Sequence, residues 1–236
     1  MSLEPSWTGR AALMTATGGH PYARYTGGDD TRGYQRDSTV VWAVGPAAWG
    51  IGDPLHAAKV GTGIAGLNRI DLPRVDEDAT AHLLPVARQR DWQFRWTFSA
   101  PPQRTGETRV VPLGPTHHDG ISRVLDDVLS YTGNRPGDPR LRAWYGIFDG
   151  EHLAAVGGDR SRHGVGYLAP IAVAARHQGR GYGAALTAAL TRALLSEFGV
   201  CALGIVEHNL KAKDFFNLMG YQESLHRSAI DLHTRQ

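Results

Sequence analysis

The sequence is poor in cysteine and nearly balanced in charge. Its 236 residues include one cysteine, Cys201, which excludes an intramolecular disulfide and a zinc site built from several thiolates. Cys201 lies in an apolar run, so we expect a buried side chain rather than a nucleophile. Lys and Arg number 25 against 23 Asp and Glu, a formal net charge of +2. This balance gives no electrostatic reason to expect nucleic acid or an anionic membrane as a partner.

Long apolar runs and targeting signals are missing as well. No stretch approaches the roughly 18 apolar residues of a membrane-spanning helix, and the first residues, Met1 to Pro5, lack the basic and apolar regions of a signal peptide. The histidines are scattered, and His117-His118 lacks metal-ligand spacing, so no metal is expected. We therefore expect a cytoplasmic protein, either a monomer or a homodimer.

A glycine-rich turn is the most informative segment of the chain. An apolar strand ends at Val173, and the residues from Gln178 to Ala184 lead into an Ala/Leu-rich helical pattern that reaches Leu195. Glycines let the backbone approach an anion closely, and the start of a helix presents unpaired N–H groups and the positive end of its dipole. The turn therefore predicts a ligand that carries phosphate.

Two common phosphate loops fit this turn less well. The Walker loop requires Gly-Lys-Ser/Thr, and no lysine lies near the turn. A dinucleotide fingerprint fits Gly179-x-Gly181-x-x-Ala184, and Glu197 and Glu207 bracket the expected offset of a ribose-binding acid. Too little chain follows for the rest of such a domain, so an NAD-dependent oxidoreductase stays a remote alternative.

A third spacing fits best. Gln178-x-x-Gly181-x-Gly183-Ala184 resembles the Q/R-x-x-G-x-G/A signature of the GNAT (Gcn5-related) N-acetyltransferase superfamily. A second segment, from Leu203 to Tyr221, is similar to the family's strand followed by an N-x-x-A-x-x-x-Y-x-x-x-G-F helix. Its matching positions are Asn209, Ala212, Gly220 and Tyr221. The resemblance covers roughly residues 108 to 233.

The resemblance implies acetyl-CoA as the cosubstrate. In the family, backbone N–H groups of the turn hold the pyrophosphate, and the pantetheine arm pairs like an extra strand with the strand that precedes the turn. A backbone N–H on that strand would polarise the thioester carbonyl. The cofactor-binding residues implied here are Ile171, Val173, Gln178, Gly179, Arg180, Gly181, Tyr182, Gly183, Ala184, Asn209, Ala212 and Phe216.

The resemblance is incomplete at the expected proton carriers. Some relatives have a catalytic carboxylate on the strand before the turn, where this chain has Tyr167. The catalytic candidates are Glu207, Tyr167 and His163, with Asp159 and His208 as nearby substitutes. Phe216 occupies the place of the family's tyrosine acid, and a phenyl ring cannot donate a proton.

The resemblance predicts an N-acetyltransferase that moves an acetyl group from acetyl-CoA to a primary amine of a small molecule or a protein by direct attack. A non-catalytic acyl-CoA-binding protein of the same fold is the alternative, because both usual proton carriers are replaced.

The predicted fold class is α/β with a mixed sheet. Residues 108–236 are expected to form the GNAT domain, and residues 1–100 a smaller α/β accessory domain. An alternative for residues 1–100 is a degenerate GNAT-like half. In that case Gly61 to Gly66 would be the relic of a second cofactor loop. A Pro-rich linker is predicted over 99–106.

The expected N-terminal elements are a loop from Thr17 to Arg36, a strand over Thr39–Val44, a helix capped by Asp53, and a strand with an aromatic face of Trp92, Phe94, Trp96 and Phe98. Two short strands are expected to end the chain near Leu232.

Overall fold

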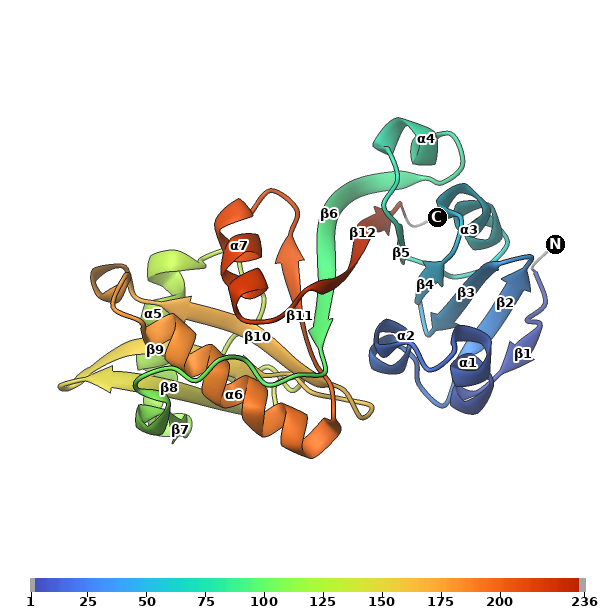
Figure 1. Cartoon of the computed structure of the whole chain (residues 1–236). Coiled ribbons are helices and arrows are strands. Elements are labelled where there is room, and N and C mark those ends of the chain that lie inside the picture. The colour runs from blue at the N-terminus through green and yellow to red at the C-terminus, as the bar shows by residue number, and fades with distance from the viewer. Residues whose placement is uncertain (1–2, 234–236) are drawn as a thin grey trace. The chain divides into compact units, whose positions relative to one another are not determined.

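The computed structural model describes residues 3–233, and the chain forms two compact units (Figure 1). Unit 1 comprises Met1–Phe94, Ile205–Leu210 and Ser224–Gln236, and unit 2 comprises Arg95–Gly204 and Lys211–Glu223. Each unit is a sheet covered by helices. Among the described residues, no helix has the length and apolar character needed to span a bilayer.

Unit 1 contains the first ten elements of the chain and the last strand. Its sheet has the order β1-β2-β3-β4-β5-β12-β6, in which β4 and β5 are parallel, whereas β5 and β12 are antiparallel. The elements are β1 (Trp7–Thr8), α1 (Arg10–Thr17), α2 (Pro21–Thr26), β2 (Arg32–Arg36), β3 (Thr39–Val44), β4 (Ala47–Ile51), α3 (Pro54–Thr62), β5 (Arg69–Pro73), α4 (Glu77–Ala81), β6 (Val86–Thr97) and β12 (Glu223–Leu232).

Unit 2 begins within β6 and has the strand order β6-β11-β10-β9-β8-β7. Strands β10 and β11 are parallel, and β7 to β10 are antiparallel. The elements are β7 (Val111–Leu113), α5 (His118–Val128), β8 (Ala143–Asp149), β9 (His152–Asp159), β10 (Gly166–Val173), α6 (Tyr182–Phe198), β11 (Cys201–Val206) and α7 (Leu210–Leu218), with 3₁₀ turns at Glu107–Arg109, Pro115–His117 and Ala175–His177.

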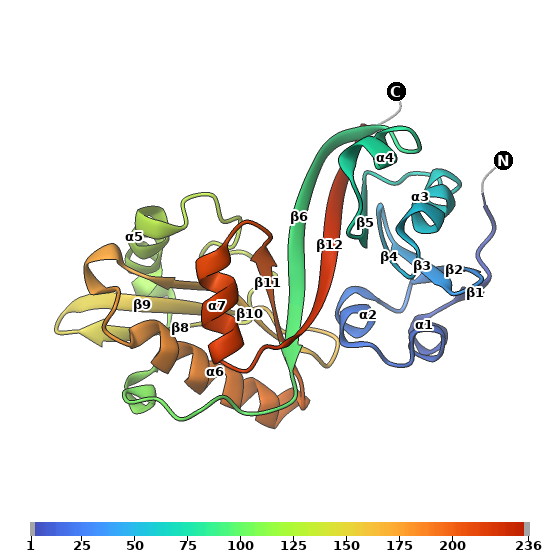
Figure 2. The same ribbon diagram turned by 45° about the horizontal axis from the view of Figure 1, so that its top comes forward.

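The two halves of the chain repeat one order of elements. In each, a short strand and helical segment precede three antiparallel strands, then a helix, a parallel strand, a short helix and a final strand. Helix α3 of the first repeat therefore corresponds to α6 of the second, and β4–β5 to β10–β11. The last strand of the second repeat, β12, pairs with β5 in unit 1, with Ile230 opposite Ile70 (Figure 2). The compact units are discontinuous along the chain, and the domain ranges 1–100 and 108–236 stay a prediction.

In unit 2, helices α5 and α6 cover opposite faces of the sheet. Val156 of β9 belongs to the same buried cluster as Leu125 of α5. The next residue, Gly157, faces α6, and a Cβ there would lie 2.8 Å from Leu190 Cδ1. Successive strand residues point to opposite faces, so the two helices pack on opposite sides. Unit 1 follows the same plan, because Trp42 contacts Tyr22 of α2 while Val41 shares a cluster with residues of α3.

A buried ion pair stabilises unit 1. Asp71 of β5 and Arg227 of β12 are each 1% exposed, and Arg227 Nε donates to Asp71 Oδ1 at 2.8 Å. Tyr22 Oη donates to the same oxygen at 2.6 Å, and Trp92 Nε1 donates to Oδ2 at 3.0 Å. The Arg227 guanidinium lies 4.4 Å from the Tyr22 ring centre. Every oxygen of the buried carboxylate is thus hydrogen-bonded, which offsets its loss of hydration.

Several N-terminal predictions are confirmed. Thr39–Val44 is a strand, and α3 starts at Pro54 with the Asp53 side chain accepting the His56 N–H at 2.7 Å. The predicted loop from Thr17 to Arg36 is wrong, because it contains α2 and β2. Helix α2 starts with Pro21 at its first position and the His20 side chain as its cap, signals that the glycines and tyrosines around it obscure.

The aromatic strand is confirmed only in part. Phe94 and Trp96 are buried, but Phe98 is 60% exposed and follows the end of β6. The polar residues that alternate with them, Gln93, Arg95 and Thr97, are buried too. Arg95 donates hydrogen bonds to Asn217 Oδ1 (2.5 Å) and to the Tyr221 carbonyl (3.3 Å), at and just beyond the C-terminal end of α7. A cation is favourable there because the last carbonyls of a helix lack internal donors.

Two further expectations are wrong. The end of the chain forms one strand, β12, in place of two short ones. The glycines from Gly61 to Gly66 lie at the C-terminal end of α3, where the helix dipole is negative, so they cannot form the relic of a phosphate loop.

We predict that Tyr22→Phe lowers the free energy of unfolding by about 1.5 to 3 kcal/mol, because it removes a hydrogen bond to a buried carboxylate while keeping the ring beside Arg227. Tyr131→Phe, at a site 72% exposed, is the control and should change stability by less than about 0.5 kcal/mol. Urea unfolding measures both. Equal stability of the two variants would contradict the role of this network.

Candidate functional site

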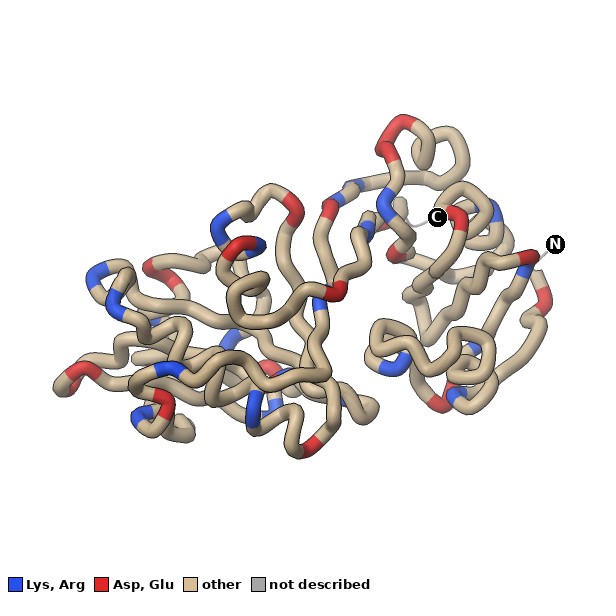
Figure 3. Tube along the Cα trace, viewed as in Figure 1, with Lys and Arg blue, Asp and Glu red and all other residues tan. Residues whose placement is uncertain are grey.

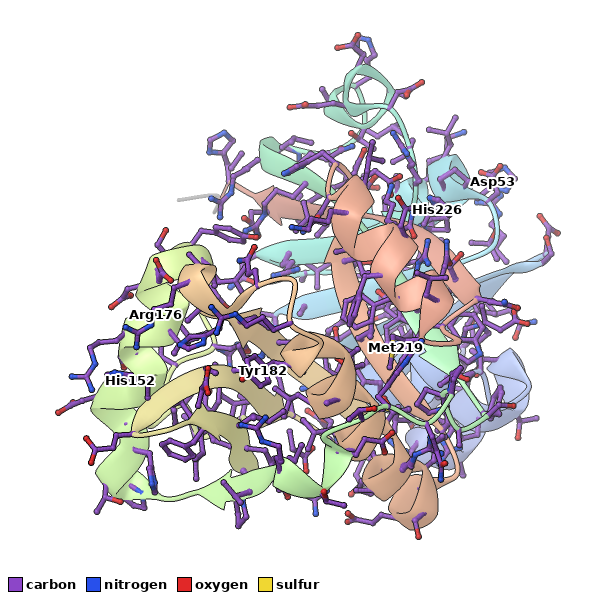
Figure 4. All side chains as sticks on the ribbon, turned by 60° about the vertical axis from the view of Figure 1, so that its left-hand side comes forward. Asp53, His152, Arg176, Tyr182, Met219 and His226 are labelled. Atoms are coloured by element: carbon purple, nitrogen blue, oxygen red, sulfur yellow. The ribbon has the colours of Figure 1, made fainter. Side chains whose placement is uncertain are left out.

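The glycine turn of unit 2 adopts a conformation that requires glycine. Gly179 and Gly181 have φ angles of 77° and 83°, in the left-handed region. A Cβ placed on either residue would meet nothing within 4 Å, so open space adjoins this backbone. Helix α6 begins immediately afterwards at Tyr182 (Figure 4). The turn therefore exposes backbone groups to a ligand.

The N-terminus of α6 is uncapped. Its N-cap residue, Gly181, contributes no side-chain hydrogen bond, and the N–H groups of Tyr182, Gly183 and Ala184 have no acceptor within the helix. The corresponding helix of the first repeat, α3, is closed: Asp53 caps it and Pro54 lacks an N–H (Figure 4). Of these two equivalent helix starts, only that of α6 is open to an external anion.

The side chains of the turn are partly engaged. Gln178 Nε2 donates to the Val173 carbonyl at 3.2 Å, which ties the turn to the end of β10. Arg180, 58% exposed, lies 3.4 Å from the Asp149 carboxylate. Arg176 Nε donates to His177 Nε2 at 3.0 Å, while His177 Nδ1 lies 3.2 Å from Asp149 without the alignment of a hydrogen bond. Two arginines and a histidine thus lie in the turn before α6, with the Asp149 carboxylate beside His177 and Arg180.

Strand β10 has a free edge before the turn. Its parallel pairing with β11 ends at Leu168 and Leu203, whereas Ile171 and Val173 still pair with β9 on the other edge. Within residues 3–233, the β11 pairing does not continue along β10 past Leu168, and an extended ligand can bind such an edge as an added strand. The predicted residues from Ile171 to Ala184 lie on consecutive segments of the chain: the end of β10, the glycine turn and the first turn of α6.

The second motif is anchored in the core of unit 2. Gly220, with φ 88°, follows α7 and turns the chain so that Tyr221 is fully buried. Tyr221 Oη hydrogen-bonds with Thr191 (2.7 Å) and donates to Cys201 Sγ at 3.1 Å. The Phe216 ring packs edge-on to Tyr221 with centres 5.8 Å apart, and Ala212 lies on the same helix. Asn209 precedes α7, and its N–H donates to the Val206 carbonyl.

The catalytic candidates lie in different surroundings. Tyr167 is buried, and its N–H donates to Ser161 Oγ at 2.9 Å. His163 is exposed at the tip of the turn between Arg162 and Val165, with φ 53°. Asp159 is buried and accepts hydrogen bonds from Ser161. The structure does not bring these three residues into the hollow that contains Glu207 and His208.

That hollow lies in unit 1 and has a volume of about 320 Å³. Its lining includes four carboxylates, although basic and acidic residues are interspersed along the trace of each unit (Figure 3). The lining residues are Val75, Asp76, Glu77, Gln89, Asp91, Glu207 and His208. The hollow is therefore suited to a cation.

Glu207 is held by residues from three strands and their ends. Gln93 Nε2 donates to both carboxylate oxygens, at 3.3 and 3.2 Å. Arg74 Nη1 lies 3.3 Å from Oε1, and His226 Nδ1 lies 3.4 Å from Oε2. The Glu207 N–H donates to the Asp91 carbonyl at 3.0 Å. These partners could not be predicted from the sequence, because they are far apart along the chain and follow no motif.

Within the described residues, no group of three or more His, Cys, Asp or Glu side chains is arranged to hold a metal ion. Unit 2 offers an open helix start that suits a phosphate-bearing ligand, and unit 1, by itself, has a carboxylate in an acidic hollow.

One family model matches part of the chain. Residues 116–221 are similar to the acetyltransferase (GNAT) family. No match was found among curated proteins.

Solved structures share the fold over most of the chain. A protein assigned to the GNAT family from Novosphingobium aromaticivorans is 19% identical, with a TM-score of 0.57 over 92% of this chain and 95% of that one. A GCN5-related N-acetyltransferase from Kribbella flavida is 12% identical, with a TM-score of 0.53 over 98% of each chain. An acetyltransferase of the family from Colwellia psychrerythraea is 12% identical, with a TM-score of 0.53 over 93% and 89%. At these identities the likeness shows the fold.

Burial raises the pKa of the Cys201 thiol to about 12 and that of the Tyr221 hydroxyl well above its usual range. As pH rises above about 9, the unfolded chain loses the thiol proton while the folded chain keeps it, so stability falls by up to about 1.4 kcal/mol per pH unit. We predict that Cys201→Ser flattens this decline, as measured by urea unfolding between about pH 8 and 10. Parallel curves for wild type and variant would contradict the assignment.

Proposed function

We propose that the protein is an N-acetyltransferase that transfers an acetyl group from acetyl-CoA to a primary amine of a small molecule or a protein by direct attack. The observation that carries the proposal is the uncapped start of α6 behind a left-handed glycine turn, within a segment that matches the GNAT family. We further propose a cytoplasmic location and a monomeric or homodimeric state.

The residues present fit coenzyme A. The open N–H groups from Gly179 to Ala184 would hold its diphosphate, with Arg176 and Arg180 adding positive charge. The free edge of β10 at Ile171 to Val173 would pair with the extended pantetheine arm, and a backbone N–H there would hydrogen-bond the acyl carbonyl oxygen. When bound, acetyl-CoA supplies the acyl group as a thioester whose thiol, with a pKa of about 8.5, is a tolerable leaving group without an acid at Phe216.

Glu207 is the proposed proton acceptor. An amine with a pKa near 10 is protonated in neutral water and must lose its proton before it can attack. Glu207 lines the hollow and is partly exposed at 19%, so a substrate amine can reach it. The surrounding Asp76, Glu77 and Asp91 favour an acceptor that carries positive charge.

The first test concerns the helix start. Gly181→Asp places at the N-cap of α6 the residue type that caps α3, and we expect affinity for coenzyme A to fall at least about 100-fold by calorimetry, through repulsion and self-capping. Gly199→Asp is the matched control, because Gly199 also has a left-handed φ (71°) but follows the other end of α6. It should bind coenzyme A like the wild type. Retained affinity in folded Gly181→Asp would refute the proposed binding site.

The second test concerns Glu207. Glu207→Gln should reduce kcat/KM for amine acetylation by about 10² to 10⁴ while leaving coenzyme A affinity unchanged, since it removes a proton acceptor. Glu151→Gln, in an exposed turn, is the control and should have wild-type activity. Thiol release with an amine panel provides the readout. A wild type that binds acetyl-CoA but releases no thiol with any amine would favour the alternative, a non-catalytic acyl-CoA-binding protein.

A further inference from the structure

We propose that Gln93 is a positioning residue that orients Glu207 and holds its carboxylate in the ionised form. The inference rests on the proposed role of Glu207 as proton acceptor. Gln93 lies on β6, far from both GNAT motifs in the sequence, and no motif singles it out.

The contacts place Gln93 behind the carboxylate. It is 2% exposed, and its Nε2 lies 3.3 and 3.2 Å from the two oxygens of Glu207. The Glu207 N–H donates to the carbonyl of Asp91, which lies two residues before Gln93 on β6. Strand β6 therefore holds both the main chain and the side chain of Glu207.

Gln93 differs from the other side chains around Glu207 because its amide is buried and uncharged. Arg74 and His226 also contact the carboxylate, but their side chains are 51% and 49% exposed, so solvent and salt weaken their influence. Asp91 lies 3.5 Å from the same Arg74, and Asp76, Glu77 and His208 complete the charged and titratable lining of the hollow.

A buried donor favours the charged form of its acceptor. An N–H shared by both oxygens stabilises the carboxylate relative to the neutral acid, which has only one good acceptor oxygen facing the amide. Loss of this donor would let Glu207 keep its proton to higher pH. The acid limb of the pH–rate profile should then move upward.

The experiment is a double-mutant cycle in the full-length protein with Gln93→Leu, Glu207→Gln and the double variant. Gln93→Leu keeps the side-chain size but removes the donor. We expect it to reduce kcat about 10-fold, to move the acid limb of kcat/KM upward by about one pH unit, and to leave coenzyme A affinity unchanged. In the Glu207→Gln background it should change kcat less than about twofold, since Gln93 acts through Glu207.

Thr97→Val is the matched control, because Thr97 is another buried polar residue of β6 whose hydroxyl bonds to Ser99 and not to Glu207. Its acid limb should stay in place. If Gln93→Leu does not fold, Gln93→Met replaces it, and an NMR titration of the labelled Glu207 carboxyl reports the same shift without turnover.

Two results would overturn the inference in distinguishable ways. An impaired Glu207→Gln enzyme with an unmoved acid limb in Gln93→Leu, or equal effects of Gln93→Leu in both backgrounds, would reduce Gln93 to a packing residue and leave the proposed function intact. Full activity of Glu207→Gln would overturn the inference together with the role of Glu207.

Discussion

The open N-terminus of α6 is the constraint on which the proposed chemistry depends. A helix start leaves several N–H groups without acceptors, and a protein satisfies them with a side chain, water or a ligand. This chain contains both solutions at equivalent places. Asp53 closes α3 in the first repeat, whereas Gly181 leaves α6 open in the second. A carboxylate at one N-cap and a glycine at the other explain why two repeats of one topology should differ in anion binding.

The repeated topology also determines how each sheet is completed. Strand β12 follows α7 in the chain but pairs with β5, and the buried Asp71–Arg227 ion pair joins these two strands. The same strands and their neighbours supply Arg74, Asp91, Gln93 and His226 around Glu207. The packing of unit 1 and the environment of the proposed proton acceptor therefore both depend on the pairing of β12 with β5.

The sequence predicted the local features well and the long-range ones poorly. The glycine turn, the Ala/Leu-rich helix that follows it and the Asp53 cap follow from signals within a few residues, and the structure has all of them. The single strand β12 and the burial of Gln93 and Arg95 depend on partners more than a hundred residues away. Alternation along β6 predicted one aromatic face, but it did not predict the partners of the polar residues between, which the second repeat provides. Glu207 is a candidate from the sequence because the expected strand position holds Tyr167 and not an acid, whereas the surroundings of Glu207 could not be predicted.

A crystal structure of the protein with coenzyme A tests the central claim most directly. The account predicts one coenzyme per chain, with its diphosphate on the backbone N–H groups between Gly179 and Ala184 and its extended arm along the free edge of β10. Density for the diphosphate at the start of α3, or a coenzyme that binds without contacting the α6 turn, would contradict it.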